Sequence, residues 1–295
     1  MVDNARLEHL LAYASPFAQS SPVLEPVAQP LDFLDMDPMR YKWLFDDAQL
    51  TPSREDLTAA LKRDHAPIPA PENREGYSRG RDFGYWISGY LAYLNVCEMA
   101  ARQGVIGGRY LDFGGSTGRL FRHFLFQGDA FDVWSCDFKT SSVQWNLLHY
   151  PQTIKAFQNM YHPFLPLEDN SFDLITAMSV FTHIDETETS WLLELRRVLK
   201  PGSIALITIH DEQSWKTMPD YLRSRVIQFR PDLAGIDELP EGRQVSTHRT
   251  DDPLRCLVFH SRSFIRRQWS RYFDVLDIVP GRFGFQSAVL LRKPI

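Results

Sequence analysis

Apolar and polar positions alternate along most of the chain with the periods of helices and strands. Trp86, Tyr90, Tyr93 and Leu94 recur at helical spacing and predict a helix over Tyr85–Ala101. Further helices are predicted by amphipathic segments at Arg119–Phe126, Val143–His149, Thr187–Leu199 and Ser263–Tyr272. Strands are predicted by short apolar runs at Tyr110–Phe113, Asp132–Phe138, Ile154–Gln158, Phe172–Phe181 and Ser203–His210.

The order of these elements predicts the fold class. Strands that alternate with helices form a parallel sheet with helices on both faces, so we expect a doubly wound α/β fold. The last two predicted strands, Phe273–Val279 and Gln286–Leu291, are joined by a short connection and must therefore be antiparallel. The prediction is a mostly parallel seven-stranded sheet that ends in an antiparallel hairpin.

The first 80 residues lack this alternating pattern, because prolines recur through them and proline interrupts helices and strands. We expect a mainly helical and loop extension with short helices at Met39–Phe45 and Ser53–Arg63. This extension is either a packing segment or a lid. Residues 81–295 form the main domain, and residues 211–260 form a long insertion within it.

Composition and charge argue against several classes of protein. The chain has 295 residues and a net charge of −5, which argues against nucleic acid as a partner because phosphate contacts need Lys and Arg. No apolar run is long enough to span a membrane, and the first residues lack a signal-peptide pattern. Three separated cysteines, Cys97, Cys136 and Cys256, predict neither a zinc site nor a disulfide framework. We expect a cytoplasmic protein without a metal site.

The strongest local motif is a Gly-rich turn between a predicted strand and helix, from Tyr110 to Arg119. Its glycines let a ligand approach the main chain, and free N–H groups at a helix start favour an anionic group such as a carboxylate. A structural turn is the alternative. The dinucleotide fingerprint requires glycines at positions occupied by Gly114, Ser116 and Arg119, and two of the three fail. A nicotinamide or nucleotide-sugar enzyme is therefore disfavoured.

Polar residues follow three further strands at the sheet edge where ligands bind in this fold. Asp137 follows Asp112 by 25 residues and either accepts hydrogen bonds from both ribose hydroxyls or caps the next helix. His183 is either a general base or a histidine that bonds the loop backbone. His210 and Asp211 either orient His183, contact substrate, or mark a strand-to-loop transition.

Together these motifs resemble the class I S-adenosylmethionine-dependent methyltransferases. Asp112 to Gly118 is similar to that family's D-x-G-x-G-x-G loop, with Ser116 in place of the usual middle glycine. Phe172-Asp173-Leu174-Ile175, the run from Leu193 to Gly202, and the terminal hairpin resemble later features of the family. The resemblance spans about residues 80–295 and implies a Rossmann-like domain that binds S-adenosylmethionine.

The resemblance also implies residue roles. Gly114 to Gly118 line the methionine moiety, Asp137 holds the ribose, and Phe138, Met160 and Asn159 surround the adenine. The implied cofactor-binding set is Asp112, Gly114, Gly115, Ser116, Gly118, Asp137, Phe138, Asn159, Met160 and Ser179. The run from Ser179 to His183 resembles bacterial branches that methylate sugars and cell-surface glycans. It implies O-methylation of a sugar or other small molecule, with His183 as base and His210 or Asp211 assisting.

Two regions are candidates for the acceptor pocket. Aromatic rings suit sugars and Arg suits a carboxylate or phosphate, which favours Tyr77, Arg79, Tyr85, Trp86 and Trp215. A core helix is the alternative for the first four. Arg262, Arg266, Arg267 and Arg271 form either a phosphate-binding patch or a solvated helix face. N-methylation, protein methylation and a non-catalytic binding role stay open.

Overall fold

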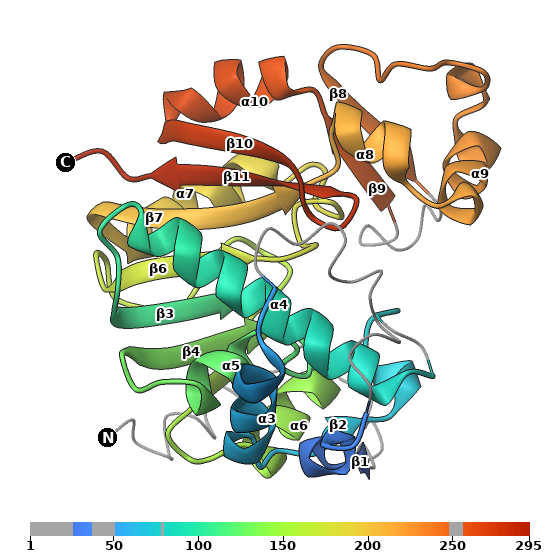
Figure 1. The fold of residues 1–295 in the computed structure, drawn as a ribbon. Coiled ribbons are helices and arrows are strands. Elements are labelled where there is room, and N and C mark those ends of the chain that lie inside the picture. The colour runs from blue at the N-terminus through green and yellow to red at the C-terminus, as the bar shows by residue number, and fades with distance from the viewer. Residues whose placement is uncertain (1–25, 37–50, 78–79, 248–255) are drawn as a thin grey trace. The chain divides into compact units, whose positions relative to one another are not determined.

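The computed structural model describes residues 26–36, 51–77, 80–247 and 256–295. The chain forms two compact units, residues 1–161 and 162–295. Seven strands build the mostly parallel main sheet (Figure 1). The strand order is β3-β4-β5 in the first unit and β10-β11-β7-β6 in the second. The predicted α/β class, with a sheet that closes in an antiparallel hairpin, is confirmed.

The first unit contains three parallel strands and their helices. The strands are β3 (Gly108–Phe113), β4 (Phe131–Asp137) and β5 (Lys155–Gln158), and the pairing is parallel throughout. The helices are α4 (Asp82–Ala101), α5 (Phe121–Phe126) and α6 (Thr140–His149). Each predicted element of this stretch exists, with ends that shift by up to three residues.

The second unit contains the antiparallel end of the sheet. Its strands are β6 (Phe172–Ala177), β7 (Leu199–Ile209), β10 (Asp274–Phe283) and β11 (Gln286–Arg292). β11 pairs antiparallel with both β7 and β10, whereas β6 and β7 are parallel. Its helical elements are α7 (Glu188–Val198), α10 (Arg262–Gln268) and the 3-10 turn η5 (Trp269–Arg271).

Three predicted boundaries in this unit are wrong. The strand predicted at Phe273–Val279 continues to Phe283 as β10, so the connection to β11 is shorter than expected. β6 ends at Ala177 rather than Phe181, because Ser179 adopts a φ of 57°, which no strand accommodates. Pro201-Gly202 lies inside β7 rather than after a helix that reaches Leu199. The β6–β7 register shifts there, between Phe172 and Leu174, so the Pro-Gly pair falls where the ladder is interrupted.

The predicted insertion is a small α/β subassembly. It holds α8 (Glu212–Thr217), α9 (Asp220–Phe229), a 3-10 turn η4 (Pro231–Leu233), and the antiparallel pair β8 (Arg243–Thr247) and β9 (Cys256–His260). Trp215, Val226 and Phe259 are buried in its own apolar cluster. His248 and Arg249 lie outside the described residues.

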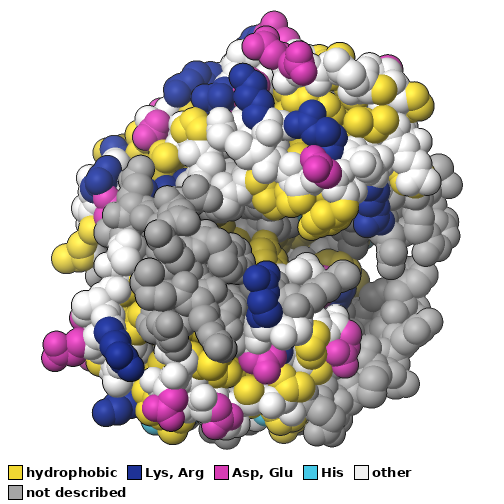
Figure 2. Space-filling model, turned by 45° about the vertical axis from the view of Figure 1, so that its right-hand side comes forward, with side chains coloured by type: hydrophobic (Ala, Val, Ile, Leu, Met, Phe, Trp, Pro, Cys, Tyr) yellow, Lys and Arg dark blue, Asp and Glu magenta, His cyan; other side chains and the backbone are white. Residues whose placement is uncertain are grey.

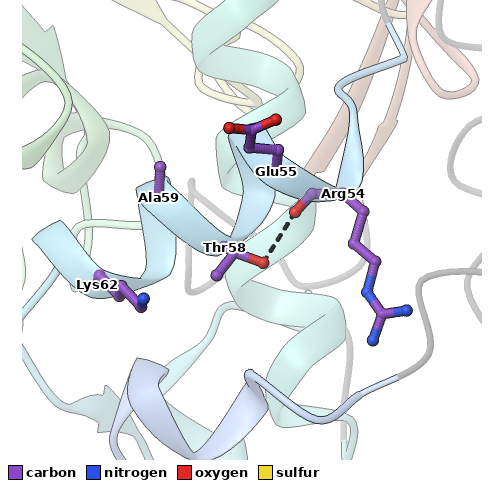
Figure 3. A pocket seen from close by; sticks show the side chains of 5 residues that line it. All are labelled: Arg54, Glu55, Thr58, Ala59 and Lys62. Atoms are coloured by element: carbon purple, nitrogen blue, oxygen red, sulfur yellow. Dashed lines mark hydrogen bonds between the residues drawn. The ribbon is translucent and has the colours of Figure 1, made fainter.

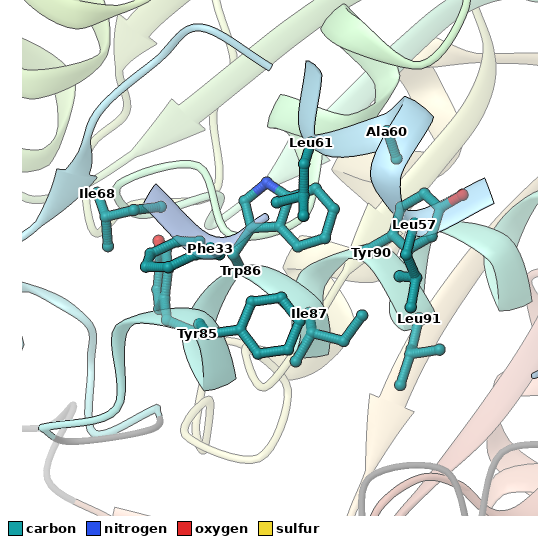
Figure 4. Packing of buried hydrophobic residues seen from close by; sticks show 11 residues of the cluster. Phe33, Leu57, Ala60, Leu61, Ile68, Tyr85, Trp86, Ile87, Tyr90 and Leu91 are labelled. Carbon is teal, nitrogen blue, oxygen red and sulfur yellow. The ribbon is translucent and has the colours of Figure 1, made fainter. Parts of the chain in front are cut away.

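The described part of the N-terminal extension packs onto α4. It comprises β1 (Pro26–Ala28), η1 (Pro30–Phe33), α3 (Arg54–Arg63), β2 (Ile68–Pro69) and η3 (Pro71–Asn73). Ser53 caps α3 as predicted, since its Oγ accepts from Asp56 N at 3.0 Å. Leu57 and Leu61 of α3 pack with Trp86 of α4 in one buried cluster (Figure 4). The helix predicted at Met39–Phe45 lies outside the described residues.

A buried ion pair also links the N-terminal extension to α5. Arg122 of α5 donates from Nε to Asp64 Oδ2 at 2.7 Å and from Nη2 to Asp64 Oδ1 at 2.9 Å. Both side chains have no solvent exposure. The Trp86 indole N–H also donates to Asp64 Oδ2, at 2.7 Å. The stretch around Asp64 therefore belongs to the core of the first unit.

The described surface is of mixed charge. Basic and acidic side chains are interspersed with hydrophobic ones on the face drawn in Figure 2. On α10, Arg262 pairs with Glu212 and Arg267 pairs with Glu241, as a solvated helix face does. A hollow of about 460 Å³ on α3 is lined only by side chains of that helix, so it is a surface feature rather than a cleft (Figure 3). Within the described ranges, no helix has the length and apolarity required to cross a membrane.

Candidate cofactor and acceptor sites

The Gly-rich turn after β3 has the backbone that the sequence predicts. Gly114 and Gly118 adopt φ values of 74° and 89°, in the left-handed region that favours glycine. Ser116, at the position of the usual middle glycine, adopts a φ of 47°. Asn146 of α6 donates from Nδ2 to the Ser116 carbonyl oxygen at 2.8 Å and holds this strained residue in place.

Two glycines of the turn are required by what lies behind them. A Cβ added to Gly118 lies 2.4 Å from Tyr150 Oη, and one added to Gly115 lies 2.3 Å from Ser135 Oγ. Both distances are shorter than any tolerated contact. The Tyr150 hydroxyl donates to the Thr117 carbonyl oxygen at 2.9 Å. The turn is thus packed closely against Tyr150, which follows α6, and against β4.

Asp137 ends β4 and faces the Gly-rich turn. Its Oδ2 accepts from Ser116 N at 2.9 Å, and its Oδ1 accepts from Lys139 N at 2.9 Å. The pKa of Asp137 is raised to about 6, because burial and the charge of Glu75 outweigh the two backbone donors and the Lys139 charge, which lower it. Each carboxylate oxygen keeps a further lone pair, so the group is able to accept from a pair of hydroxyls.

The residues predicted around an adenine follow β5. Asn159 is buried, and its Nδ2 donates to the Met160 carbonyl oxygen at 3.0 Å. Phe138 and Met160 are 42% and 45% exposed, which is unusual for large apolar side chains and leaves apolar surface for a flat ring. Asp112, at the end of β3, is buried behind the turn.

The first unit also passes a test of fit for S-adenosylmethionine. Ser116 Oγ and Asn159 Oδ1 are buried and have no hydrogen-bond partner among the described residues. Both atoms are therefore available to hydrogen-bond a polar group. The first lies in the turn predicted for the methionine moiety, and the second belongs to the residue predicted at the adenine edge.

His183 lies in the loop after β6, in the second unit. Its Nδ1 lies 2.8 Å from the Cys256 carbonyl oxygen, which only accepts, so Nδ1 carries the proton. Cys256 Sγ in turn contacts the His183 carbonyl oxygen at 3.2 Å. In the neutral ring Nε2 then holds the lone pair, which is the tautomer that a general base needs.

His210 and Asp211 have different surroundings. Burial, together with the charges of His183 and His260, lowers the pKa of His210 to about 3, so its ring is neutral. Asp211 caps α8, because its Oδ1 accepts from Gln213 N and Ser214 N at 3.0 Å. Its Oδ2 lies 3.2 Å from Arg262 Nε. These contacts match the strand-to-loop alternative for Asp211.

Ser179 belongs to a polar cluster in the second unit. Its backbone N–H donates to Thr208 Oγ1 at 2.7 Å, and its Oγ donates to Gln286 Oε1 at 2.9 Å. Gln286 Nε2 lies 3.4 Å from His210 Nε2. Gln286, on β11, was not expected from the sequence, where it reads as an ordinary strand residue.

The predicted acceptor residues are mostly buried. Tyr85, Trp86 and Trp215 are each at most 1% exposed, the first two in the α4 cluster and Trp215 in the insertion cluster. The alternative of a core helix therefore describes Tyr85 and Trp86 better than a sugar platform does. The Tyr77 ring lies 4.0 Å from the Arg119 guanidinium. Arg79 lies outside the described residues.

Several contacts of the first-unit site were not foreseen. Asn146 of α6 and Tyr150, which follows that helix, support the turn, and Glu75 and Lys139 form an ion pair beside Asp137. No local signal marks them, because their partners are distant in sequence. Among the described residues, no group of three His, Cys, Asp or Glu side chains is placed to hold a metal ion.

Comparison with known proteins identifies one domain. Residues 111–207 match the family model described as a methyltransferase domain, which covers β3 to β7 and both sequence motifs of the turn and β6. The comparison with curated proteins finds no match.

Solved structures share the fold at low identity. The glycopeptide N-methyltransferase MtfA in complex with S-adenosyl-L-homocysteine superposes with a TM-score of 0.50 at 17% identity, over 69% of this chain and 90% of that one. A complex of the Haloferax volcanii Trm112 methyltransferase activator with a putative methyltransferase gives 0.49 at 13% identity, over 76% and 99%. An S-adenosylmethionine-dependent methyltransferase from Methanosarcina mazei gives 0.45 at 16% identity, over 64% and 93%.

The matched domain, the Gly-rich turn and the seven-stranded sheet agree with one another. Residues 111–207 are a methyltransferase domain of the class I type, and the chain is an S-adenosylmethionine-dependent methyltransferase.

Proposed function

We propose that this methyltransferase transfers a methyl group to a hydroxyl oxygen of a small-molecule acceptor such as a sugar, with His183 as general base. The observation that carries the proposal is the tautomer of His183, whose Nδ1–H is held by the Cys256 carbonyl oxygen. Such a bond orients the ring and places the lone pair of the neutral imidazole on Nε2.

The first unit would hold the methyl donor. The turn from Gly114 to Gly118 takes the methionine moiety, Asp137 accepts from the ribose hydroxyls, and Asn159 with Phe138 and Met160 encloses the adenine. Unpaired Ser116 Oγ and Asn159 Oδ1 support these roles. The bound donor supplies an already activated methyl group, so the protein's main task is to align the acceptor oxygen.

A neutral alcohol is a weak nucleophile until its proton leaves. His183 Nε2 takes that proton as the new carbon–oxygen bond forms, and the Cys256 carbonyl stabilises the imidazolium through Nδ1–H. His210 is neutral and buried, so we propose that it shapes the polar cluster of Ser179 and Gln286 rather than carrying a charge. A neutral amine attacks without first losing a proton, so we expect the dependence on His183 to be larger for a hydroxyl acceptor than for a neutral amine.

The experiment is a release assay for S-adenosylhomocysteine on a panel of hydroxyl-bearing and amine-bearing small molecules. His183→Ala is expected to lower turnover on the best hydroxyl acceptor by about 10² to 10⁴ while the Kd for S-adenosylmethionine stays unchanged. Equal turnover of His183→Ala and the wild type refutes the base. Turnover only on amines refutes O-methylation, and binding without turnover on the whole panel favours a scaffold role.

A further inference from the structure

A segment of the N-terminal extension, Asn73–Tyr77, contacts the Gly-rich turn. Thr117 Oγ1 donates to the Asn73 carbonyl oxygen at 2.9 Å, and the Tyr85 hydroxyl lies 3.2 Å from the same Oγ1. At the end of the segment, Arg119 of the turn lies over the Tyr77 ring. Residues outside the domain matched by the family model therefore border the predicted cofactor site.

The segment is held rigidly by Arg74, which is almost wholly buried. Its Nε donates to the Pro69 carbonyl oxygen at 2.8 Å, and its Nη2 donates to Asp82 Oδ1 at 2.6 Å. The next two residues, Glu75 and Gly76, adopt φ values of 49° and 84°. This turn aims the Glu75 side chain outward from an anchored backbone.

Glu75 meets Lys139, two residues beyond Asp137. Lys139 Nζ donates to both Glu75 carboxylate oxygens, each at 2.7 Å. The backbone N–H of Lys139 already bonds Asp137 Oδ1. The charges of Glu75 and Lys139 both act on Asp137, in opposite directions, so the three groups form one electrostatic unit.

We propose that Asn73–Tyr77 forms a wall of the cofactor site and that Glu75 is a positioning residue, which holds the Lys139 ammonium away from the Asp137 carboxylate. This inference rests on the proposed ribose-binding role of Asp137. The ionised carboxylate has about four acceptor positions, and backbone N–H groups of Ser116 and Lys139 occupy two. An ammonium carries three donors on a flexible stem, so an unrestrained Lys139 would compete with the ribose hydroxyls for the remaining two.

The test measures S-adenosylmethionine binding by isothermal titration calorimetry in four versions of the full chain. These are the wild type, Glu75→Gln, Lys139→Met, and the double variant. Glu75→Gln is expected to raise Kd by about fivefold, Lys139→Met to leave it near the wild-type value, and the double variant to return close to wild type. Glu75 and Lys139 side chains are 41% and 43% exposed, so neither change opens a cavity.

A matched control is Asp173→Asn, which breaks an ion pair of the same kind, because Lys200 Nζ donates to both Asp173 oxygens at 2.9 and 2.7 Å. It is expected to leave Kd unchanged. A wild-type Kd for Glu75→Gln refutes the proposal, and a double variant as weak as Glu75→Gln refutes the route through Lys139. Failure of the underlying ribose assignment is distinguished by Asp137→Asn, which then binds as tightly as the wild type.

Discussion

The buried pair of Asp64 and Arg122 gives the sharpest prediction about stability. Asp64 accepts four hydrogen bonds, two from the Arg122 guanidinium, one from the Trp86 indole and one from Ala66 N at 3.2 Å. Asp64→Ala leaves the guanidinium charge buried with only the carbonyl oxygens of Pro67 and Ala66 as acceptors. The change therefore removes a charge partner and several acceptors at once.

The expected magnitude follows from these contacts. Removing one partner of a buried ion pair costs about 3 to 5 kcal/mol, and the orphaned indole N–H adds about 1 kcal/mol. We therefore expect Asp64→Ala to lower the free energy of unfolding by about 4 to 6 kcal/mol, a large share of the total for one domain. The measurement is urea denaturation followed by far-UV circular dichroism.

Two further variants test whether the loss comes from the buried charges. Asp173→Asn breaks an ion pair whose side chains are 22% and 42% exposed, and it should cost less than about 1 kcal/mol. Asp64→Leu combined with Arg122→Met removes both charges and should recover much of the loss, since apolar pairs replace buried ion pairs well. A loss below about 1 kcal/mol for Asp64→Ala would refute the reasoning that this pair is desolvated.

The same pair predicts a pH dependence. Burial raises the pKa of Asp64, but the charge and hydrogen bonds of Arg122 outweigh burial and hold the pKa below its usual value. A lowered pKa in the folded state means that the stabilisation is complete above the ordinary aspartate pKa, near about 4, and is lost as pH falls through the folded value. The stability difference between wild type and Asp64→Ala should therefore shrink only below about pH 4.

Three other variants or conditions are predicted as follows. The ribose hydroxyls need the ionised form of Asp137, whose pKa is raised to about 6. The affinity for S-adenosylmethionine, measured by calorimetry, should therefore fall about tenfold per pH unit below pH 6. The affinity of Asp137→Asn should not change with pH over the same range. Gly118→Ala places its Cβ 2.4 Å from Tyr150 Oη at a φ of 89°, so a thermal melt should show a loss of at least about 2 kcal/mol, and an unchanged melt contradicts this close packing. Glu188→Ala strips acceptors from His260 and Trp269, at 2.7 and 2.9 Å, and should cost about 3 kcal/mol in urea denaturation, whereas the exposed neighbour Glu186→Ala should cost almost nothing.

Local patterns were sufficient to predict most elements of the described chain. Helical spacing of aromatic residues located α4, and the cap at Ser53 located the start of α3. The turn after β3 could also be predicted, because a positive φ favours glycine and Gly114 and Gly118 have that backbone. The end of β6 was misjudged, since its apolar run continues past Ala177 while Ser179 turns the backbone.

The roles of individual polar residues depend on burial and on partners that spacing does not reveal. His183 and His210 both follow strands of the sheet, yet the fold buries His210 and lowers its pKa to about 3 while a carbonyl oxygen of distant Cys256 orients His183. From the sequence, Asp211 is a candidate catalytic acid, whereas in the structure its carboxylate caps α8. Trp86 suits a sugar platform by type, but its surroundings make it a core residue.

The order of strands and helices, and the Gly-rich turn typical of methyltransferases, could be predicted from local patterns, because they depend on residues that are close in the chain. The tertiary structure decided which charges are buried and paired. Asp64 and Arg122 are 58 residues apart, and Glu75 and Lys139 are 64 apart. Such pairs form only when chain folding brings them together and removes water from around them, which raises the strength of each charge interaction and the cost of leaving it unmade.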